Sequence, residues 1–264
     1  MNVRGTEYAY IEAGSGPLLL LAHGLLGGKE LYAPQLAALS DSYRCVAFDW
    51  PGHGGTGFSP DGWTADDLVA DVPALIAALG EERAHLAGVS QGGAVAVRTA
   101  LARPEVVASL TIMCAGPSGP APEGLAGLRA LTAALAADPD GPERRARAAA
   151  FTRSAFHDPG MPERDPEAFE AELDVLLAHP RAALELLPGV PASYGDITPR
   201  LGEVKVPTLV IWGESDPRPA LGAVVADAIP GARLVTVPAA GHHVNMDAPA
   251  EVSATLRAFL ADVA

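Results

Sequence analysis

The sequence has few cysteines and no long apolar run. Cys45 and Cys114 are the only cysteines among 264 residues, and both lie in apolar segments. That placement is typical of free buried thiols in a reducing compartment rather than of a disulfide framework. Residues 17–22 form the longest early apolar run, which is too short to span a bilayer, and the first residues lack the apolar core of a secretory signal. We therefore expect a cytoplasmic protein.

Basic residues are also scarce. The chain has 18 Lys and Arg against 32 Asp and Glu, which gives a net charge of −14. Nucleic acids and anionic membrane surfaces repel such a protein, so neither is expected as a partner. Hydrophobic residues make up 49% of the chain and charged residues 19%, a globular composition. The expected partner is a small-molecule substrate, and the sequence leaves the oligomeric state open, a homo-oligomer included.

Short β-type runs alternate with helical ones, which predicts an α/β fold with a mostly parallel sheet covered on both faces. The opening segment also predicts an antiparallel hairpin that closes on the turn at residues 15–17. Apolar runs indicate strands at 17–24, 43–49, 84–89, 106–115, 207–213 and 232–238. Helical patterns lie between them at 29–40, 64–79, 91–103, 219–229 and 248–262.

Residues 117–203 interrupt this alternation. They contain no convincing strand and hold half of the 24 prolines. Helical stretches are predicted at 123–137, 142–155, 166–178 and 181–187, separated by Gly, Pro and Asp turns. The chain is therefore expected to have one core, built from residues 1–116 and 204–264, with residues 117–203 as a helical insert.

The pentapeptide Gly88-Val89-Ser90-Gln91-Gly92 fits the G-x-S-x-G pattern of a nucleophile elbow. It follows a predicted strand and begins a predicted helix, which is the setting that the motif requires. Glycine two residues either side of Ser90 avoids a collision in a tight turn. The helix N-terminus also places the Gln91 amide where it can stabilise negative charge. The alternative is an incidental serine in a glycine-rich loop.

A serine nucleophile needs a base, and the base needs a carboxylate to orient it. The sequence has seven histidines. His242 and His243 follow the last predicted strand, at the sheet edge from which a base could reach Ser90. His85 begins a predicted strand, and His23 and His53 belong to glycine turns. His157 and His179 lie in the insert, where solvated surface positions are expected.

Two acids follow the strand at 207–213 and so lie at the same edge. Asp216 is the preferred orienting carboxylate, and Glu214 is the alternative. Asp216 could instead only cap the helix that follows Pro217.

Several motifs together resemble the α/β-hydrolase fold superfamily, in particular its serine-nucleophile, esterase-like and lactonase-like members with a helical lid. The order Ser, Asp, His is that of this fold. The resemblance also rests on the segments at 23–28 (HGLLGG), 49–54 (DWPGHG) and 213–216 (GESD), and on Gly241-His242 followed by Asp247 and Pro249. The last spacing selects His242 over His243. The resemblance implies an eight-stranded, mostly parallel sheet flanked by helices, with the lid inserted after the sixth strand.

The resemblance also implies roles for individual residues. Ser90 would be the nucleophile, His242 the base and Asp216 the orienting carboxylate, while the backbone N–H groups of Leu25 and Gln91 would form the oxyanion hole. His23 and His53 would have structural roles in their glycine turns. No dinucleotide fingerprint and no ligand set with metal spacing occurs in the sequence, so neither a cofactor nor a metal ion is expected.

The sequence predicts a pocket between Ser90 and the insert. Its expected lining is apolar and comprises Leu25, Leu26, Met113, Phe151, Phe156 and Val244. The predicted function is a serine hydrolase that cleaves an ester, lactone or thioester of a small apolar substrate through an acyl-enzyme. Two alternatives stay open. The same three residues could serve C–C bond hydrolysis, perhydrolysis or cofactor-free lyase or cyclase chemistry, or the chain could be a non-catalytic ligand-binding module.

Overall fold

The structure is a computed structural model, and it describes residues 1–137 and 141–263. Seven strands form the central sheet, in the order β3-β5-β4-β6-β7-β8-β9. Their bounds are β3 (Tyr10–Ala13), β4 (Leu18–Ala22), β5 (Arg44–Phe48), β6 (Ala84–Val89), β7 (Val107–Met113), β8 (Thr208–Gly213) and β9 (Arg233–Val237). β3 runs antiparallel to β5, and the other neighbouring pairs are parallel. The predicted α/β-hydrolase fold is confirmed.

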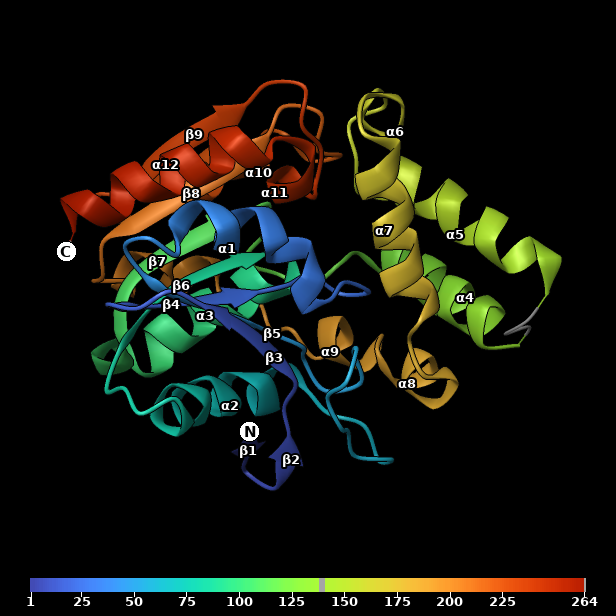
Figure 1. Ribbon diagram of the computed structural model, residues 1–264, viewed down its shortest axis with the longest axis horizontal. Helices are drawn as coiled ribbons and strands as arrows, with labels where there is room; N and C mark the ends of the chain where they lie inside the picture. The colour runs from blue at the N-terminus through green and yellow to red at the C-terminus, as the bar shows by residue number, and fades with distance from the viewer. Residues whose placement is uncertain (138–140, 264) are drawn as a thin grey trace.

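Helices cover both faces of this sheet. The core helices are α1 (Ala33–Leu39), α2 (Ala65–Ala78), α3 (Gln91–Ala102), α10 (Leu221–Ala228), α11 (Val244–Asp247) and α12 (Pro249–Asp262). The 3₁₀ helices η1 (Lys29–Tyr32) and η2 (Pro104–Val106) accompany them, and a third, η3 (Thr198–Glu203), lies at the end of the insert. α1 packs against α12, and α2 packs against α3, with the two pairs on opposite faces of the sheet (Figure 1). All residues of β4 and β6 are buried, as expected for strands covered on both sides.

The sheet has seven strands instead of the expected eight. β1 (Asn2–Val3) and β2 (Thr6–Glu7) pair only with each other, because Arg4 and Gly5, both with positive φ, turn the chain back after two residues. The hairpin expected to close at residues 15–17 is also wrong. β3 pairs with β5 rather than with β4, so that turn joins two strands that have β5 between them.

Between β7 and β8 the described residues form helices and contain no strand. These are α4 (Pro122–Ala137), α5 (Pro142–Ala155), α6 (Met161–Arg164), α7 (Pro166–Leu177), α8 (Arg181–Leu186) and α9 (Gly189–Ala192). α4 packs against α8, and α5 against α7. Figure 1 shows α4 to α8 gathered beside the core, at the right of the view. The four predicted helical stretches correspond to α4, α5, α7 and α8.

Residues 1–137 and 141–263 include no helix with the length and apolarity needed to cross a membrane. Both cysteines are buried free thiols, as expected. The segments that follow β4, β6, β7 and β8 leave the sheet at the same edge because these strands are parallel. In open α/β sheets this carboxyl edge is where ligands bind.

Candidate active site

Ser90 lies in a strained turn between β6 and α3. Its backbone has φ 52° and ψ −115°, a conformation that residues other than glycine rarely adopt, and its amide is fixed by a 2.9 Å hydrogen bond to the Met113 carbonyl. The flanking glycines have a steric cause. A Cβ on Gly88 would lie 2.3 Å from the backbone carbon of Gly92, and one on Gly92 would lie 1.9 Å from the Ala22 carbonyl oxygen. The turn therefore requires glycine at both positions and presents Ser90 at the sheet edge.

The structure brings Ser90, His242 and Asp216 together. His242 Nε2 lies 2.8 Å from Ser90 Oγ, and His242 Nδ1 lies 2.6 Å from Asp216 Oδ2. An ionised carboxylate can only accept, so Nδ1 carries the proton and Nε2 is free to accept from the serine hydroxyl. The second oxygen of Asp216 accepts from the Arg218 amide at 2.7 Å. This chain of contacts can withdraw a proton from Ser90 and hold it on the imidazole.

The electrostatics favour a neutral imidazole beside an ionised carboxylate. Burial lowers the pKa of His242, while its hydrogen bond to Asp216 acts in the opposite direction and is outweighed. Burial pushes the pKa of Asp216 upward, but the hydrogen bond and charge of His242 overcome this, and the pKa lies below its ordinary value. The imidazole is therefore able to accept a proton near neutral pH.

Glu214, the alternative acid, does not contact the imidazole. Its side chain is exposed, and its amide donates to the Val237 carbonyl at 2.9 Å. Asp216 does not cap a helix either, because α10 begins five residues later, at Leu221. The geometry thus gives Asp216 the position next to His242.

Leu25 and Gln91 line the same cavity as Ser90. Gln91 is the first residue of α3, and the first amides of a helix have no acceptor within it. The turn that carries Leu25 is held by His23, whose Nε2 accepts from the Trp50 amide at 3.1 Å and whose Nδ1 lies 2.7 Å from the Gly24 carbonyl. Burial lowers the pKa of His23 to about 4, so it is neutral near pH 7. The His53 ring packs against the His23 ring at a tilt of 58°, with centroids 4.8 Å apart.

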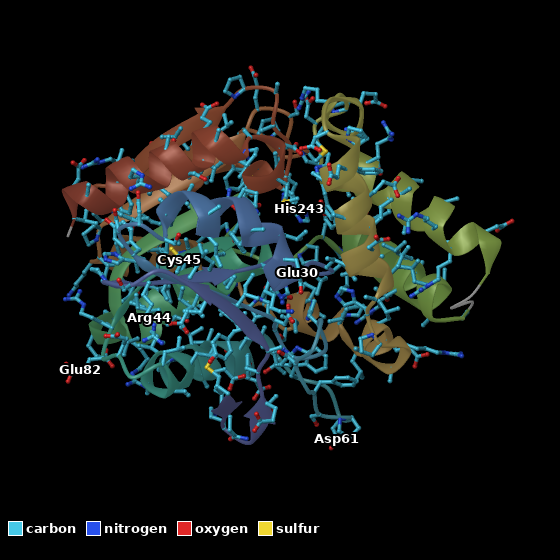
Figure 2. The ribbon with its side chains drawn as sticks, viewed as in Figure 1. Glu30, Arg44, Cys45, Asp61, Glu82 and His243 are labelled. Carbon is cyan, nitrogen blue, oxygen red and sulfur yellow. The ribbon has the colours of Figure 1, made fainter. Side chains whose placement is uncertain are left out.

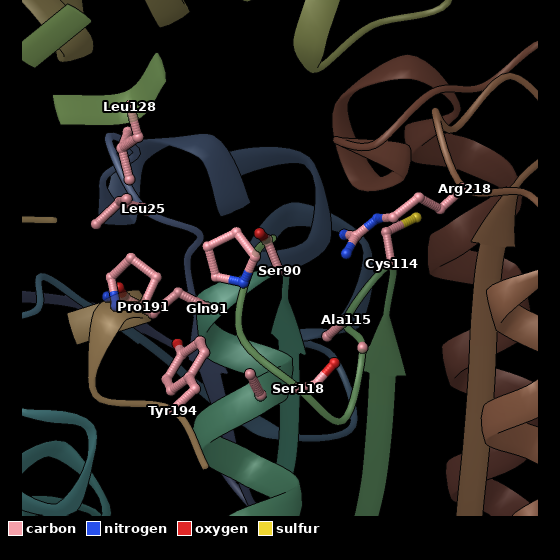
Figure 3. A pocket seen from close by; sticks show the side chains of 13 residues that line it. Leu25, Ser90, Gln91, Cys114, Ala115, Ser118, Leu128, Pro191, Tyr194 and Arg218 are labelled. Carbon is pink, nitrogen blue, oxygen red and sulfur yellow. The ribbon is translucent and has the colours of Figure 1, made fainter. Parts of the chain in front are cut away.

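The cavity beside Ser90 has a volume of about 150 Å³. Figure 3 shows its side chains, which come from the segments after β4, β6, β7 and β8 and from the insert. The thirteen lining residues are Leu25, Ser90, Gln91, Ala94, Cys114, Ala115, Gly116, Ser118, Pro120, Leu128, Pro191, Tyr194 and Arg218. Burial keeps the pKa of the Cys114 thiol well above its ordinary value, so this cysteine is not a competing nucleophile at neutral pH.

The five other residues expected to line the pocket lie elsewhere. Leu26, Met113 and Val244 are fully enclosed by the core. The rings of Phe151 and Phe156 meet edge to face with centroids 5.1 Å apart, and the Phe156 ring stacks on His243 with centroids 4.1 Å apart. Apolar residues near a motif pack the core as readily as they line a cavity, so sequence position did not separate the two. The polar lining residues Tyr194 and Arg218 were missed, although Arg218 lies only two residues after Asp216.

A second buried cluster joins the insert to the core next to the candidate base. Glu172 of α7 contacts two histidines: its Oε1 lies 2.6 Å from His243 Nδ1, and its Oε2 lies 2.8 Å from His157 Nε2. His157 Nδ1 lies 2.5 Å from Asp247 Oδ1 in the core. Figure 2 shows His243 where the core meets α7. Burial opposes the charge on His157, but its hydrogen bond to Asp247 and its ion pair with Glu172 raise its pKa to about 9.

The surface positions expected for His157 and His179 are wrong, since both are 4% exposed. His157 is enclosed between two carboxylates, and His179 packs edge to face on His53 with centroids 4.9 Å apart. The sequence could not indicate this, because their partners lie in distant segments.

Two groups of side chains place donor atoms close enough to share a metal ion: Cys114 with Asp216 and His242, and His157 with Glu172 and His243. The contacts of Asp216 with His242 and of Glu172 with His243 are hydrogen bonds of 2.6 Å, and Glu172 also forms an ion pair of 2.8 Å with His157. Ligands of one tetrahedral zinc ion lie about 3.3 Å apart. Both groups therefore fit a shared proton better than a metal ion.

Comparison with known proteins identifies the family. Residues 19–255 match the Alpha/beta hydrolase family. The chain belongs to this family. Its sheet order and the turn at Ser90 agree with the assignment, and the protein is an enzyme of the hydrolase type.

Three similar proteins illustrate the range of the family. The dihydrolipoyllysine-residue acetyltransferase component of the acetoin cleaving system of Pseudomonas putida is 32% identical, over 98% of this chain and 68% of that protein. The 2-hydroxy-6-oxononadienedioate/2-hydroxy-6-oxononatrienedioate hydrolase of Paraburkholderia xenovorans strain LB400 is 33% identical, over 81% and 72%. The structure of the enol-lactonase from Burkholderia xenovorans LB400 has a TM-score of 0.85 and 28% identity, with 98% of each chain covered.

Proposed function

We propose that this hydrolase cleaves an ester, lactone or thioester of a small substrate through an acyl-enzyme on Ser90. The observation that carries the proposal is the continuous contact from Ser90 Oγ through His242 to Asp216. A hydroxyl, an imidazole and a carboxylate in that order form the relay of serine hydrolases. The similarity to an enol-lactonase supports an ester-type bond, because a lactone is a cyclic ester.

The reaction has two halves. His242 removes the proton of Ser90 as Oγ forms a bond to the carbonyl carbon of the substrate, and the N–H groups of Leu25 and Gln91 stabilise the oxyanion. The imidazolium then returns the proton to the leaving oxygen or sulfur as the bond to the leaving group breaks. In the second half His242 takes a proton from water, which attacks the acyl-enzyme, and Ser90 is regenerated. Loss of one oxyanion donor typically costs about 10²–10³ in rate.

The insert at residues 117–203 would act as the lid over Ser90. Leu128 on α4, with Pro191 and Tyr194 further along the insert, lines the cavity opposite the core. The cavity volume of about 150 Å³ suits a small acyl group. This part of the proposal replaces the apolar lining expected from the sequence with a lining that includes Tyr194 and Ser118.

A second candidate is C–C bond hydrolysis with the same residues. One relative is named as a hydrolase of 2-hydroxy-6-oxo dienedioates, compounds whose names describe no ester bond. The same serine, histidine and carboxylate could activate water or a carbonyl in that reaction.

The test is covalent labelling with a fluorophosphonate, followed by assay on 4-nitrophenyl esters of graded chain length. Labelling is expected at Ser90 in the wild-type protein and in Ser118→Ala, the matched control whose serine lines the same cavity. Labelling should disappear in Ser90→Ala. An unlabelled wild-type protein would exclude a working relay. Labelling with negligible turnover of every ester would favour the second candidate, to be assayed with a vinylogous 1,5-diketone.

A further inference from the structure

Arg218 brings a positive charge to the candidate active site. It follows Asp216 by two residues in the segment after β8, and it lines the cavity together with Ser90. Its backbone amide donates to Asp216 Oδ1 at 2.7 Å, which fixes the start of the side chain. Figure 3 shows the guanidinium extended from that segment toward Cys114 and Ser90 rather than away from the cavity.

This charge has no partner of its own in the part of the chain that the structure describes. The Arg218 guanidinium forms no hydrogen bond there and no ion pair with a carboxylate, whereas Arg164, on the insert, is paired with Asp158 at 2.7 Å. The charge of Arg218 acts on the Asp216 carboxylate, but the two oxygens of Asp216 form hydrogen bonds with His242 and with the Arg218 backbone amide. Arg129 and Arg181 are likewise exposed and their guanidinium groups have no partner among the described residues, but of the three only Arg218 lines the cavity that holds Ser90.

No acidic residue competes for Arg218 within the cavity. The thirteen lining residues include neutral polar and apolar side chains and one arginine, but no Asp or Glu. A guanidinium presents a planar fork of donors that matches a carboxylate with two parallel hydrogen bonds. An anionic group that enters the cavity would therefore find a cation in the wall that also holds Ser90, and no Asp or Glu among the lining side chains.

We propose that Arg218 binds a carboxylate of the substrate, so that the preferred substrates are small esters or lactones that carry an anionic group. The inference rests on the proposed function, because it assumes that the cavity beside Ser90 holds the substrate. It also departs from the apolar substrate predicted from the sequence. The net charge of −14 repels anions at long range, so a local contact is needed to bind one.

Two pairs of substrates test the proposal, each pair differing only in one charge. The mono-4-nitrophenyl ester of adipic acid is compared with 4-nitrophenyl 5-carbamoylpentanoate, which places the carboxylate or its neutral amide on the acyl side. 3-Acetoxybenzoate is compared with 3-acetoxybenzamide, which places it on the alcohol side. The charged member of at least one pair should have a kcat/KM about tenfold higher, the effect of roughly 1.4 kcal/mol. The pair that responds identifies the side on which Arg218 acts.

The preference should depend on Arg218. Arg218→Gln is expected to bring the charged-to-neutral ratio of kcat/KM close to one, and Arg218→Lys to retain part of it. Arg181→Gln is the matched control, because it makes the same change in net charge at an exposed position of α8 outside the cavity lining. That control should keep the wild-type ratio. A ratio near one in the wild-type enzyme, or a ratio that survives Arg218→Gln, would overturn the inference.

Failure of the proposed function can be told apart from failure of this inference. Turnover of esters without a charge preference contradicts only the role of Arg218. If no ester is hydrolysed, binding decides: Ser90→Ala is titrated with adipate and with adipamide, and the titrations are repeated with Arg218→Gln added. Tighter binding of adipate that is lost with Arg218→Gln supports the anion site, and equal binding of the two compounds rejects it.

Discussion

His242 Nε2 lies 2.8 Å from Ser90 Oγ, although 152 residues separate the two in the chain. His243, the next residue, points its Nδ1 to Glu172 of the insert instead. Neighbouring histidines thus face different partners. One is placed to exchange a proton with the serine, and the other contacts α7 of the insert.

Removing each histidine should therefore have different consequences. His242→Ala is expected to lower kcat on a 4-nitrophenyl ester by several orders of magnitude, because Ser90 then has no base. His243→Ala should retain far more activity and lose thermal stability, because Glu172 is left without one partner. Steady-state kinetics and melting temperatures distinguish the two. The opposite pattern would transfer the role of base to His243.

Asp216→Asn is expected to lower kcat by up to about 10⁴, because an amide in that place no longer holds Nδ1 protonated. Glu214→Gln is the matched control, since Glu214 is an exposed acid two residues earlier with no contact to His242. It should change kcat less than twofold. A larger loss in Glu214→Gln than in Asp216→Asn would reassign the carboxylate.

The pH profile should have an acidic limb below the ordinary histidine pKa of about 6.5. Burial lowers the pKa of His242, and the base must be neutral to accept the proton of Ser90. Activity should therefore persist as the pH falls to 6.5 and decline only below it. The measurement is kcat/KM against pH, corrected for any unfolding by a parallel melting curve. A limb clearly above pH 6.5 would contradict a lowered pKa of His242.

Glu172→Gln should destabilise the protein by about 3–5 kcal/mol, the usual effect of breaking a buried ion pair. Glu170→Gln is the control on the same helix, because Glu170 is exposed and pairs with Arg145 at the surface. It should cost at most about 1 kcal/mol. Denaturant unfolding at pH 6 provides both values. Equal effects of the two substitutions would mean that the buried cluster adds no stability.

The loss in Glu172→Gln should also depend on pH. The raised pKa of His157 gives stability that is present below about pH 6.5 and lost as the pH rises through about 9. The pKa of Glu172 is lowered by the charges and hydrogen bonds of both histidines, against the effect of burial, so its contribution is lost as the pH falls below about 4.3. The difference in free energy of unfolding between wild type and Glu172→Gln should therefore be greatest between about pH 4.3 and about pH 6.5.

Chain-length preference should respond to Leu128 rather than to Phe151. Leu128→Trp places a larger side chain in the cavity and should reduce kcat/KM for long acyl esters more than for acetate. Leu125→Trp, on the same helix but outside the lining, is the control and should leave this ratio unchanged. Phe151→Ala should also leave it unchanged. A shift with Phe151→Ala and none with Leu128→Trp would return the acyl pocket to the position expected from the sequence.

The sequence alone determined the fold and the positions of the site residues in the chain. Close approach of the backbone requires the glycines at 88 and 92, and burial on both faces requires the apolar run at β4. Both features can therefore be recognised from the local sequence. Parallel strands bring their carboxyl ends to one edge, which placed Ser90, Asp216 and His242 near one another. The strand count was less secure, because a short edge segment can pair in more than one way.

Only the tertiary structure decided which side chains meet across distant segments. Glu172 binds His243 and His157, Phe156 covers His243, and Arg218 faces the cavity without a partner among the described residues. None of these follows from periodicity, because an apolar or charged residue in the insert has the same local pattern whether it packs on the core, lines the cavity or faces solvent. The packing of the insert against the sheet edge fixes that choice, and with it the shape and charge of the cavity.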